Sequence, residues 1–556
     1  MQQRISFILT IIFILGSFFI NIYTEISLQH CAQPVQIPVN TKPNFTILLL
    51  PLDSRPPCTQ FVEKLAALAN VNLILPPPQL LDNYQTPGKT NELRTWLYSA
   101  IPNVDAAIIS TDMLIHGGLI ASRQNPPSPG TAEATIALLE ACHRANPNAS
   151  LYVFHIIPRL LIGGNNINPR YQALMQKYSV LKDEIYTFEN QPDITELEAI
   201  EQELPPEIIS NYLTLNQQTT DLSIKLIHLA DQGIISSLVL GQDDGQPFGL
   251  PNVVKQKLTN YIKHYPQLTD KVFITRGTDE VALTLLGHIL MHRAACHPRV
   301  LVQYSTPSAP TTIMPYMPHS VAKTVAEKLA IIGGVQTSDP QKADFILYIH
   351  IGTAHTSKAS LTTAASQVKN LLDSGAMVAL VDLSYRFKQE DTLLPYLIAN
   401  DTKIFRLAAY AGWNTTSNSI GTALTEGALF THALAADQTS PPNIRLYKNN
   451  LEFLAARFLD DSFYEKDILP YIAATLKQRN IDQNNLGDNY NSTNRLAKTL
   501  LTGRADTLFR QTLFRQPLAT KNGGQLLVTN LDIEADLPWS RIFEIRITPI
   551  ISVKYQ

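Results

Sequence analysis

The sequence predicts an α/β protein built on parallel β-sheets, and two observations support this prediction. From Phe45 onward, short apolar runs alternate with stretches of helical periodicity, a pattern that is typical of parallel strands covered by helices. The chain has 556 residues, whereas a single hydrophobic core stops growing at ~250–300 residues. We therefore expect more than one domain.

Ten apolar runs are interpreted as strands: Ile47–Leu50, Val71–Leu75, Ala106–Ser110, Leu151–Ile157, Ser237–Leu240, Val272–Thr275, Val300–Tyr304, Phe345–Ile349, Met377–Val381 and Ile404–Ala408. This number exceeds the eight strands of a TIM barrel. In addition, Val335–Thr337 is followed almost at once by Phe345, where a barrel would need a full helix. The prediction is therefore two doubly wound lobes of the Rossmann or flavodoxin kind, with a TIM-like barrel for the N-terminal part as the alternative.

Four regions are expected along the chain. Residues 1–43 form a signal peptide or membrane anchor with its linker, 44–270 a first α/β lobe, 271–436 a second, flavodoxin-like lobe, and 437–556 a mostly helical region. Within the last region, Gln525–Val528 and Phe543–Ile547 are expected to form a short β-hairpin, because both runs are strand-like and lie close in sequence.

The N-terminal segment carries the clearest targeting signal. Arg4 precedes an apolar run from Ile5 to Ile20, and no small-residue cleavage site follows, which favours an uncleaved anchor over a cleaved signal peptide. We therefore expect a protein that lies outside the cytoplasm, either anchored or secreted, and that meets the membrane through this segment only.

The composition argues against nucleic-acid binding and against a disordered chain. Charged residues make up 16% of the chain, the formal net charge is -3, and no basic stripe is present, so neither nucleic-acid binding nor intrinsic disorder is expected. The four cysteines lack metal-ligand spacing and are expected to be mostly unpaired. No cofactor is expected, and the oligomeric state is not determined by the sequence.

Acidic residues follow several predicted strands, at the edge where parallel α/β folds bind ligands. The strongest element is Asp243-Asp244, because adjacent carboxylates at the end of a buried strand repel each other unless one takes a proton or meets a cation. The candidate catalytic residues are Asp53, Asp112, Asp243, Asp244 and Glu280.

Neighbouring side chains supply candidate substrate contacts. Two arginines could bind hydroxyls or an anionic group, and a tryptophan beside two asparagines offers the aromatic face and amides that sugar recognition uses. The candidate substrate-binding residues are Arg55, His116, Arg123, Asp279, Trp413, Asn414 and Asn418. We predict no metal ligands, and we interpret His155, inside a strand, as a core histidine with its hydrogen bonds satisfied.

These loops resemble those of a bacterial family of uncharacterised proteins, domain of unknown function 4127. The matching stretches are Pro51-Leu52-Asp53-Ser54-Arg55-Pro56, Asp112-Met113-Leu114 with Gly117-Gly118-Leu119 and Ser122-Arg123, Gln242-Asp243-Asp244, Gly277-Thr278-Asp279-Glu280, and Gly412-Trp413-Asn414-Thr415 with Asn418. The similarity spans about residues 45–430 and extends to Leu537-Pro538-Trp539. The resemblance implies where the site lies, and it implies no particular reaction.

We expect a glycoside-hydrolase-like enzyme that acts on a cell-envelope or environmental saccharide. One of Asp243 and Asp244, with a raised pKa, would protonate the leaving oxygen. A second carboxylate, from Asp53, Asp112 or Glu280, would act as base, nucleophile or charge stabiliser.

Two other functions fit the same residues. A metal-dependent hydrolase would use the acids, together with His116, as metal ligands. A membrane-tethered sugar-binding protein would close two α/β lobes over its ligand without catalysis.

Overall fold

The computed structural model describes residues 43, 45–124, 126–160, 168–188, 191–439, 442–514, 516–521 and 523–555. The apolar N-terminal run that is expected to anchor the chain lies outside the described residues. Among the helices of the described residues, none has both the length and the apolar character needed to cross a membrane.

The first sheet has six strands, all in parallel pairs, in the order β2-β1-β3-β4-β5-β6. The strands are β1 (Thr46–Leu50), β2 (Asn72–Ile74), β3 (Ala106–Ser110), β4 (Ser150–Ile157), β5 (Ser237–Gln242) and β6 (Val272–Arg276). Because β6 pairs with β5, it belongs to the first lobe, although the expected boundary after residue 270 assigned it to the second.

The second sheet has five parallel strands in the order β11-β10-β9-β7-β8. They are β7 (Arg299–Tyr304), β8 (Val335–Thr337), β9 (Phe345–Gly352), β10 (Val378–Ser384) and β11 (Ala409–Ala411). Counted within the lobe this is the order 2-1-3-4-5 of flavodoxin-like folds, as predicted. Both sheets are open, so the barrel alternative is excluded.

One predicted strand is wrong. Ile404–Arg406 forms a 3-10 turn, and pairing with β10 begins only at Ala409. Ile404 and Phe405 are buried in this turn, and an apolar run does not by itself distinguish a buried helical turn from a buried strand.

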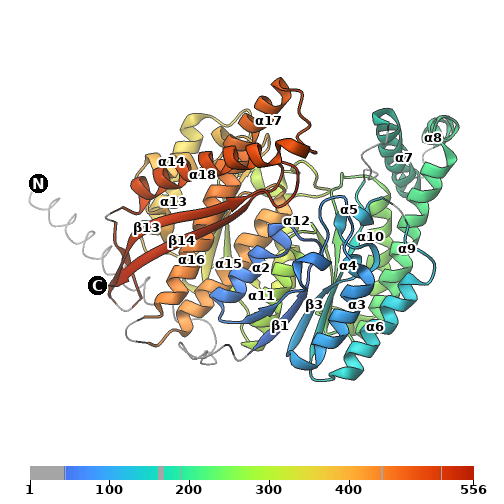
Figure 1. The fold of residues 1–556 in the computed structure, drawn as a ribbon, viewed down its shortest axis with the longest axis horizontal. Helices are drawn as coiled ribbons and strands as arrows, with labels where there is room; N and C mark the ends of the chain where they lie inside the picture. Colours follow the sequence, from blue (N-terminus) through green and yellow to red (C-terminus); the bar gives the residue numbers. More distant parts are fainter. Residues whose placement is uncertain are drawn as a thin grey trace, which may run out of the picture.

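Helices cover both sheets (Figure 1). In the first lobe they are α2 (Gln60–Leu68), α3 (Thr90–Ala100), α4 (Thr111–His116), α5 (Leu119–Ser122), α6 (Thr131–Ala145), α7 (Pro169–Phe188), α8 (Gln191–Glu203), α9 (Pro206–Asp231) and α10 (Leu250–Ile262). The next five are α11 (Val281–Arg293), α12 (Val321–Ile332), α13 (Lys358–Asp373), α14 (Leu394–Ala399) and α15 (Thr416–Ala436).

A shared layer of helices joins the two lobes. One core cluster contains residues of both sheets together with α2, α11, α12 and α15. Nearly every residue of α15 is buried, as expected for a helix that is apolar on all sides. The carboxyl edges of the two sheets are therefore held by a common core.

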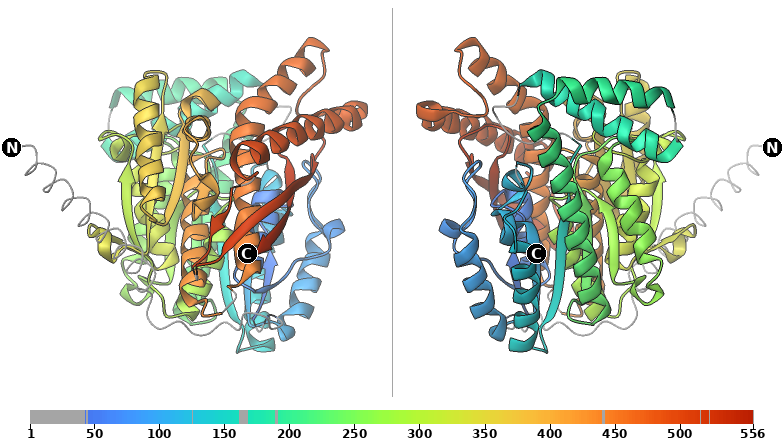
Figure 2. Two further views of the ribbon diagram at one scale, coloured as in Figure 1. Left: turned by 90° about the vertical axis from the view of Figure 1, so that its left-hand side faces the viewer. Right: turned by 90° about the vertical axis from the view of Figure 1, so that its right-hand side faces the viewer.

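The C-terminal region packs mainly on the second lobe. It consists of α16 (Ile444–Arg457), a π-helix (Phe458–Ile468), α17 (Leu469–Gln478), α18 (Tyr490–Thr512), β12 (Leu518–Ala519), β13 (Gln525–Asp536) and β14 (Arg546–Tyr555). The predicted hairpin is present as the antiparallel pair β13 and β14. The first strand is longer than predicted, but the second begins only at Arg546, so Phe543–Ile545 of the predicted run lie outside it. Figure 2 shows these strands, in red, lying against α16, in orange.

Candidate functional site

Arg55 connects the loop after β1 with the loop after β6. Its guanidinium donates to Asp53 Oδ2 from Nε at 2.9 Å and from Nη2 at 2.7 Å, and to Asp279 Oδ1 from Nη2 at 2.6 Å. All three side chains are buried. Asp53 also accepts the backbone N–H of Arg55 at 3.0 Å, so the turn after β1 orients this arginine toward Asp279.

Three further residues complete this end of the site. Asp82 accepts the backbone N–H of Ser54 at 2.7 Å, and burial together with the charge of Asp53 raises the pKa of Asp82 to about 8. From the C-terminal region, Glu544 lies 3.9 Å from Arg55, and Trp539 donates to Ser54 Oγ at 3.0 Å. No role was predicted for these residues, because only the fold brings them to β1.

Asp243 and Asp244 follow β5 and differ in their surroundings. Arg123 holds Asp243 in a two-pronged ion pair, with Nε to Oδ2 at 2.7 Å and Nη2 to Oδ1 at 2.8 Å. Burial alone would raise the pKa of Asp243, but the charge of Arg123 outweighs it and lowers that pKa. For Asp244, burial and the adjacent charge of Asp243 raise the pKa to about 6.

The groups after β1, β5 and β6 are close enough to influence one another. The charge of Asp279 contributes to the raised pKa of Asp244. Burial raises the pKa of Asp279, and the charges of Arg55 and Arg123 oppose that rise. We call Asp53, Asp82, Asp243, Asp244 and Asp279, with Arg55 and Arg123, the acidic cluster.

The structure places Glu280 in a buried ion pair and not in the predicted catalytic position. Its Oε1 pairs with Lys328 Nζ at 2.5 Å and accepts from Ser417 Oγ at 2.7 Å, and the side chain is 2% exposed. The preceding Gly277 has a φ of +83°, and a Cβ there would collide with Glu280 and Ser417. This carboxylate therefore ties α12 and α15 to the β6 loop through Oε1, while its Oε2 is buried without a hydrogen-bond partner among the described residues.

Asp112 and His116 were expected to share the cleft with Asp53, and the structure places them elsewhere. Asp112 Oδ2 accepts the backbone N–H of Ile156 at 3.0 Å and lies 3.2 Å from His155 Nδ1. His116 lines a cavity between α4, α6 and α9. This cavity lies on the other face of the first sheet from α2 and α11, because His155 and the core residue Ile156 are adjacent in β4 and point to opposite faces.

Of the predicted sugar-binding side chains after β11, only some remain available to a ligand. Trp413 is 4% exposed, packs edge-on against Phe61, and donates to Glu465 Oε1 at 3.0 Å, so its ring has no open face for a sugar. Asn418, in contrast, donates to Asp279 Oδ2 at 3.4 Å, and its Oδ1 has no partner. Asn414, half-buried, lines a small cavity beside Phe387.

An exposed aromatic pair beside the acidic cluster was missed. Tyr316 and Phe387 are 52% and 37% exposed, and their ring centroids are 6.1 Å apart. The backbone N–H of Gly245 donates to Tyr316 O at 3.1 Å, which places Tyr316 next to Asp244. Both aromatic residues have positive φ, 63° and 56°, a costly backbone conformation that concentrates at functional sites.

The comparisons with known proteins identify a family. The sequence profile described as protein of unknown function (DUF4127) matches residues 47–548. The chain belongs to this family. The match includes the C-terminal region that contributes Trp539 and Glu544, and it joins the span of about 45–430 to the Leu537-Pro538-Trp539 segment, both of which the resemblance predicted.

Other comparisons add no functional information. No curated protein matches the chain. The carboxyl transferase domain from Rhizobium etli pyruvate carboxylase is 10% identical, with 93% of this chain and 89% of that chain covered, at a TM-score of 0.15. A similarity at that level carries no argument about fold or function.

The family region also contains a buried charge cluster in the π-helix, which fixes the end of β11. Asp461 accepts the backbone N–H of Gly412 at 2.7 Å, and Lys466 Nζ donates to Gly412 O at 2.6 Å. Arg457 pairs with Asp461 at 2.6 Å. π-Helices are rare and often occur at functional sites. Because its side chains bond the backbone of Gly412, this π-helix positions Trp413 and the start of α15.

Proposed function

We propose that the protein is an extracytoplasmic, glycoside-hydrolase-like enzyme that cleaves a saccharide with paired carboxylates. The observation that carries the proposal is the contrast between Asp243 and Asp244. Arg123 keeps Asp243 ionised, whereas Asp244 has a pKa of about 6 and is half-buried. Two carboxylates whose environments separate their pKa values are what acid–base catalysis requires. The extracytoplasmic location rests on Arg4 and the apolar run that follows it.

Asp244 is the proposed proton donor to the leaving oxygen. Its pKa lets it carry a proton near neutral pH, and, among the ion pairs of the described chain, Arg123 contacts Asp243 and not Asp244. A carboxyl group in this state is suited to general acid catalysis, because the ideal catalytic pKa lies near the operating pH.

Asp279 is the proposed second carboxylate, acting as base or nucleophile. Asp53 is fully buried and engaged by Arg55 through three hydrogen bonds, so it serves to orient the arginine. Asp279 is bound by Arg55 and Asn418, which hold it in place. Burial raises the pKa of Asp279, and the charges of Arg55 and Arg123 oppose that rise. Asp279 therefore replaces Asp53, Asp112 and Glu280 as the proposed second carboxylate.

The saccharide assignment is supported by the exposed rings beside Asp244. The Tyr316 and Phe387 rings offer an apolar surface for the face of a sugar ring. The unpartnered Oδ1 of Asn418 offers a hydrogen-bond acceptor for a hydroxyl. Together they supply the aromatic face and the amide that sequence analysis assigned to Trp413 and its neighbours.

The direct test compares single variants on a panel of bacterial cell-wall glycan, chitin oligosaccharides and aryl glycosides. Asp244→Asn should abolish turnover, and Asp243→Asn should reduce it, because Arg123 would lose its ionic partner. Asp270→Asn, an exposed acid outside the cluster, is the matched control. Turnover that is undiminished in both Asp243→Asn and Asp244→Asn, or no turnover of any glycan by the wild-type chain, would rule the proposal out.

A metal-dependent hydrolase is the second candidate, favoured by one observation. Ligand atoms of Asp53, Cys58 and Asp279 all lie within 4.8 Å of one another. However, Arg55 bonds both carboxylates, and burial raises the pKa of Cys58 well above its usual value, which disfavours the thiolate that binds metals. Metal analysis of the purified protein separates the candidates, since stoichiometric metal that is lost in Asp279→Asn would favour this one.

A further inference from the structure

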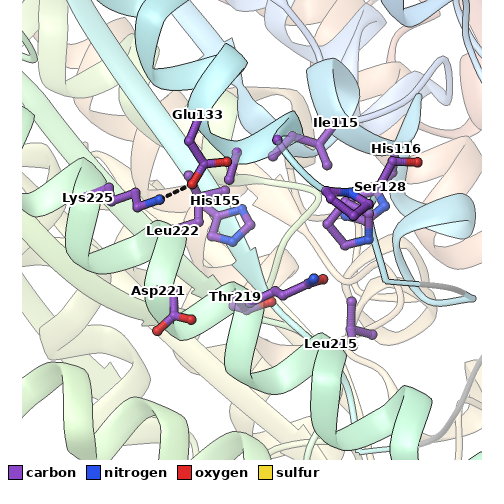
Figure 3. Close-up of a pocket in the computed structure, with 15 residues that line it drawn as sticks. Ile115, His116, Ser128, Glu133, His155, Leu215, Thr219, Asp221, Leu222 and Lys225 are labelled. Carbon is purple, nitrogen blue, oxygen red and sulfur yellow. Dashed lines mark hydrogen bonds and ion pairs between the residues drawn. The ribbon is translucent and has the colours of Figure 1, made fainter.

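A separate cavity of about 240 Å³ lies on the outer face of the first lobe. It is lined by the end of α4, the start of α6, the middle of α9 and His155 of β4 (Figure 3). Figure 3 shows His155 and His116 on the side facing α9, from which Thr219 and Leu215 project toward them. The acidic cluster contributes none of its residues to this lining.

The tautomer of His155 is fixed from one side. Its Nδ1 lies 3.2 Å from Asp112 Oδ2 and 2.9 Å from Thr111 Oγ1. Thr111 Oγ1 directs its own proton to Phe154 O at 3.2 Å, and a carboxylate can only accept. In the neutral ring the proton therefore lies on Nδ1, and Nε2 carries a lone pair.

Among the residues that the structure describes, that lone pair has no hydrogen-bond partner. His155 is 3% exposed, and its Nε2 is buried without a hydrogen bond, contrary to the expectation of a satisfied core histidine. An unpaired buried polar group costs free energy, so it needs an explanation. The Asp112–His155 arrangement is the kind that holds an imidazole ready to bind a ligand through its second nitrogen.

The rest of the lining specifies what the ligand must offer. Gln218 presents a second buried oxygen, Oε1, without a partner. Burial lowers the pKa of His116 to about 4, so its ring is neutral at pH 7. Glu133 and Lys225 neutralise each other in an ion pair, and the remaining walls include the apolar side chains of Ile115, Leu215 and Leu222.

We infer that this cavity is a second ligand site, for a small neutral ring compound that donates hydrogen bonds from at least two hydroxyl groups to His155 Nε2 and Gln218 Oε1. The volume is below the ~300–1,000 Å³ of pockets for drug-sized ligands, which fits a single ring such as one sugar or a diphenol. The inference does not depend on the reaction proposed for the acidic cluster.

The test uses pairs of probes that share a ring and differ in hydroxyl donors: glucose against tetrahydropyran, and resorcinol against benzene. Binding to the full chain is followed by titration calorimetry and by the ring ¹⁵N resonances of histidine. At least one hydroxylated probe should bind and shift the Nε2 resonance of His155, while its partner without donors should bind more weakly. The His155 resonance reports this cavity rather than the acidic cluster.

Two variants leave the Asp112–His155 pair intact. Gln218→Leu removes one acceptor at similar volume and should weaken the hydroxylated probe about fivefold, as expected for one lost hydrogen bond. Ala132→Trp fills the cavity from the half-buried first turn of α6 and should abolish binding. The inference is overturned if neither hydroxylated probe binds, if the rings without donors bind equally well, or if binding survives Ala132→Trp.

Discussion

The two sheets have the same strand order over their first five strands, yet the ends of their strands differ. In the second sheet, Asp382 accepts the backbone N–H groups of Leu393 and Leu394 at 2.7 and 3.0 Å and the hydroxyl of Tyr410 at 3.1 Å. In the first sheet, Asp244 has a neighbouring carboxylate and a raised pKa instead. The same topology thus holds a fully hydrogen-bonded carboxylate after one strand of the second lobe and a carboxylate with a raised pKa after a strand of the first.

His350, at the end of β9, supports the same conclusion. Its two ring nitrogens lie 3.1 Å from Ser305 Oγ and 2.9 Å from Asp391 O. His155, at the end of β4, has one nitrogen without a partner. The two histidines lie near the ends of parallel strands, and they differ in whether both ring nitrogens have a partner among the described residues.

The largest expected effect is on catalysis by the first lobe. Asp244→Asn removes the proposed proton donor, so kcat should fall about 10²–10⁴-fold, the usual contribution of general acid catalysis. The free energy of unfolding should not fall, because the amide removes a like charge beside Asp243. Kinetics and chemical denaturation of the same preparation check both expectations, and a variant that loses activity only because it unfolds would contradict them.

Asp382→Asn should show the reverse pattern. The amide that replaces this carboxylate directs an NH₂ group toward backbone donors, which should lower the free energy of unfolding by about 2–4 kcal/mol. Activity per folded molecule should stay within about twofold, since the Asp382 carboxylate bonds Leu393, Leu394 and Tyr410 and none of the residues of the acidic cluster. Guanidinium denaturation followed by circular dichroism measures the loss, with Asp270→Asn as control. Equal stability of the two variants would remove the contrast between the lobes.

The third effect is on the pH profile. With the pKa of Asp244 at about 6, its protonated form is depleted as the pH rises through that value. The kcat/KM should therefore fall about tenfold per pH unit above pH ~6.5. Removing the neighbouring charge with Asp243→Asn should lower the pKa of Asp244 and move this limb to lower pH. A profile that is flat from pH 6 to 8 would count against Asp244 as the acid.

The smallest expected effect concerns the aromatic pair. Tyr316→Ala should raise KM about fivefold with little change in kcat, because a stacking contact of ~1 kcal/mol is lost in both ground and transition states. Tyr186→Ala, at a tyrosine that is 50% exposed on α7, is the matched control. An unchanged KM would show that the aromatic pair does not contact the substrate.

Local patterns were sufficient for much of the fold. Nine of the ten predicted strands are present, because a short apolar run between turn signals is typical of a buried strand. The failure at Ile404–Ala408 occurred where a buried turn is as apolar as a strand. The flavodoxin-like order of the second sheet was predicted from the short connection before Phe345.

The site was predicted less completely, because pairing between side chains is a long-range property. The loops after β1, β5 and β6 do converge, and Arg55 and Asp279 meet although 224 positions separate them. Glu280 had the same local signal as Asp279, and only the position of Lys328 on α12 distinguishes the two. The roles of Tyr316 and Asp82 had no local signal beyond proline-rich and turn-like surroundings.

The sequence by itself determined the α/β class, the order of most strands and the set of acids at the strand ends, since these follow from short-range periodicity and burial. Only the tertiary structure decided which acid has a lowered pKa and which has a raised one. That choice depends on cations from distant segments, such as Arg123, which reaches Asp243 across 120 positions. The tertiary structure also placed Asp112 beside His155 instead of in the expected cleft, because adjacent residues of β4 face opposite sides of the sheet.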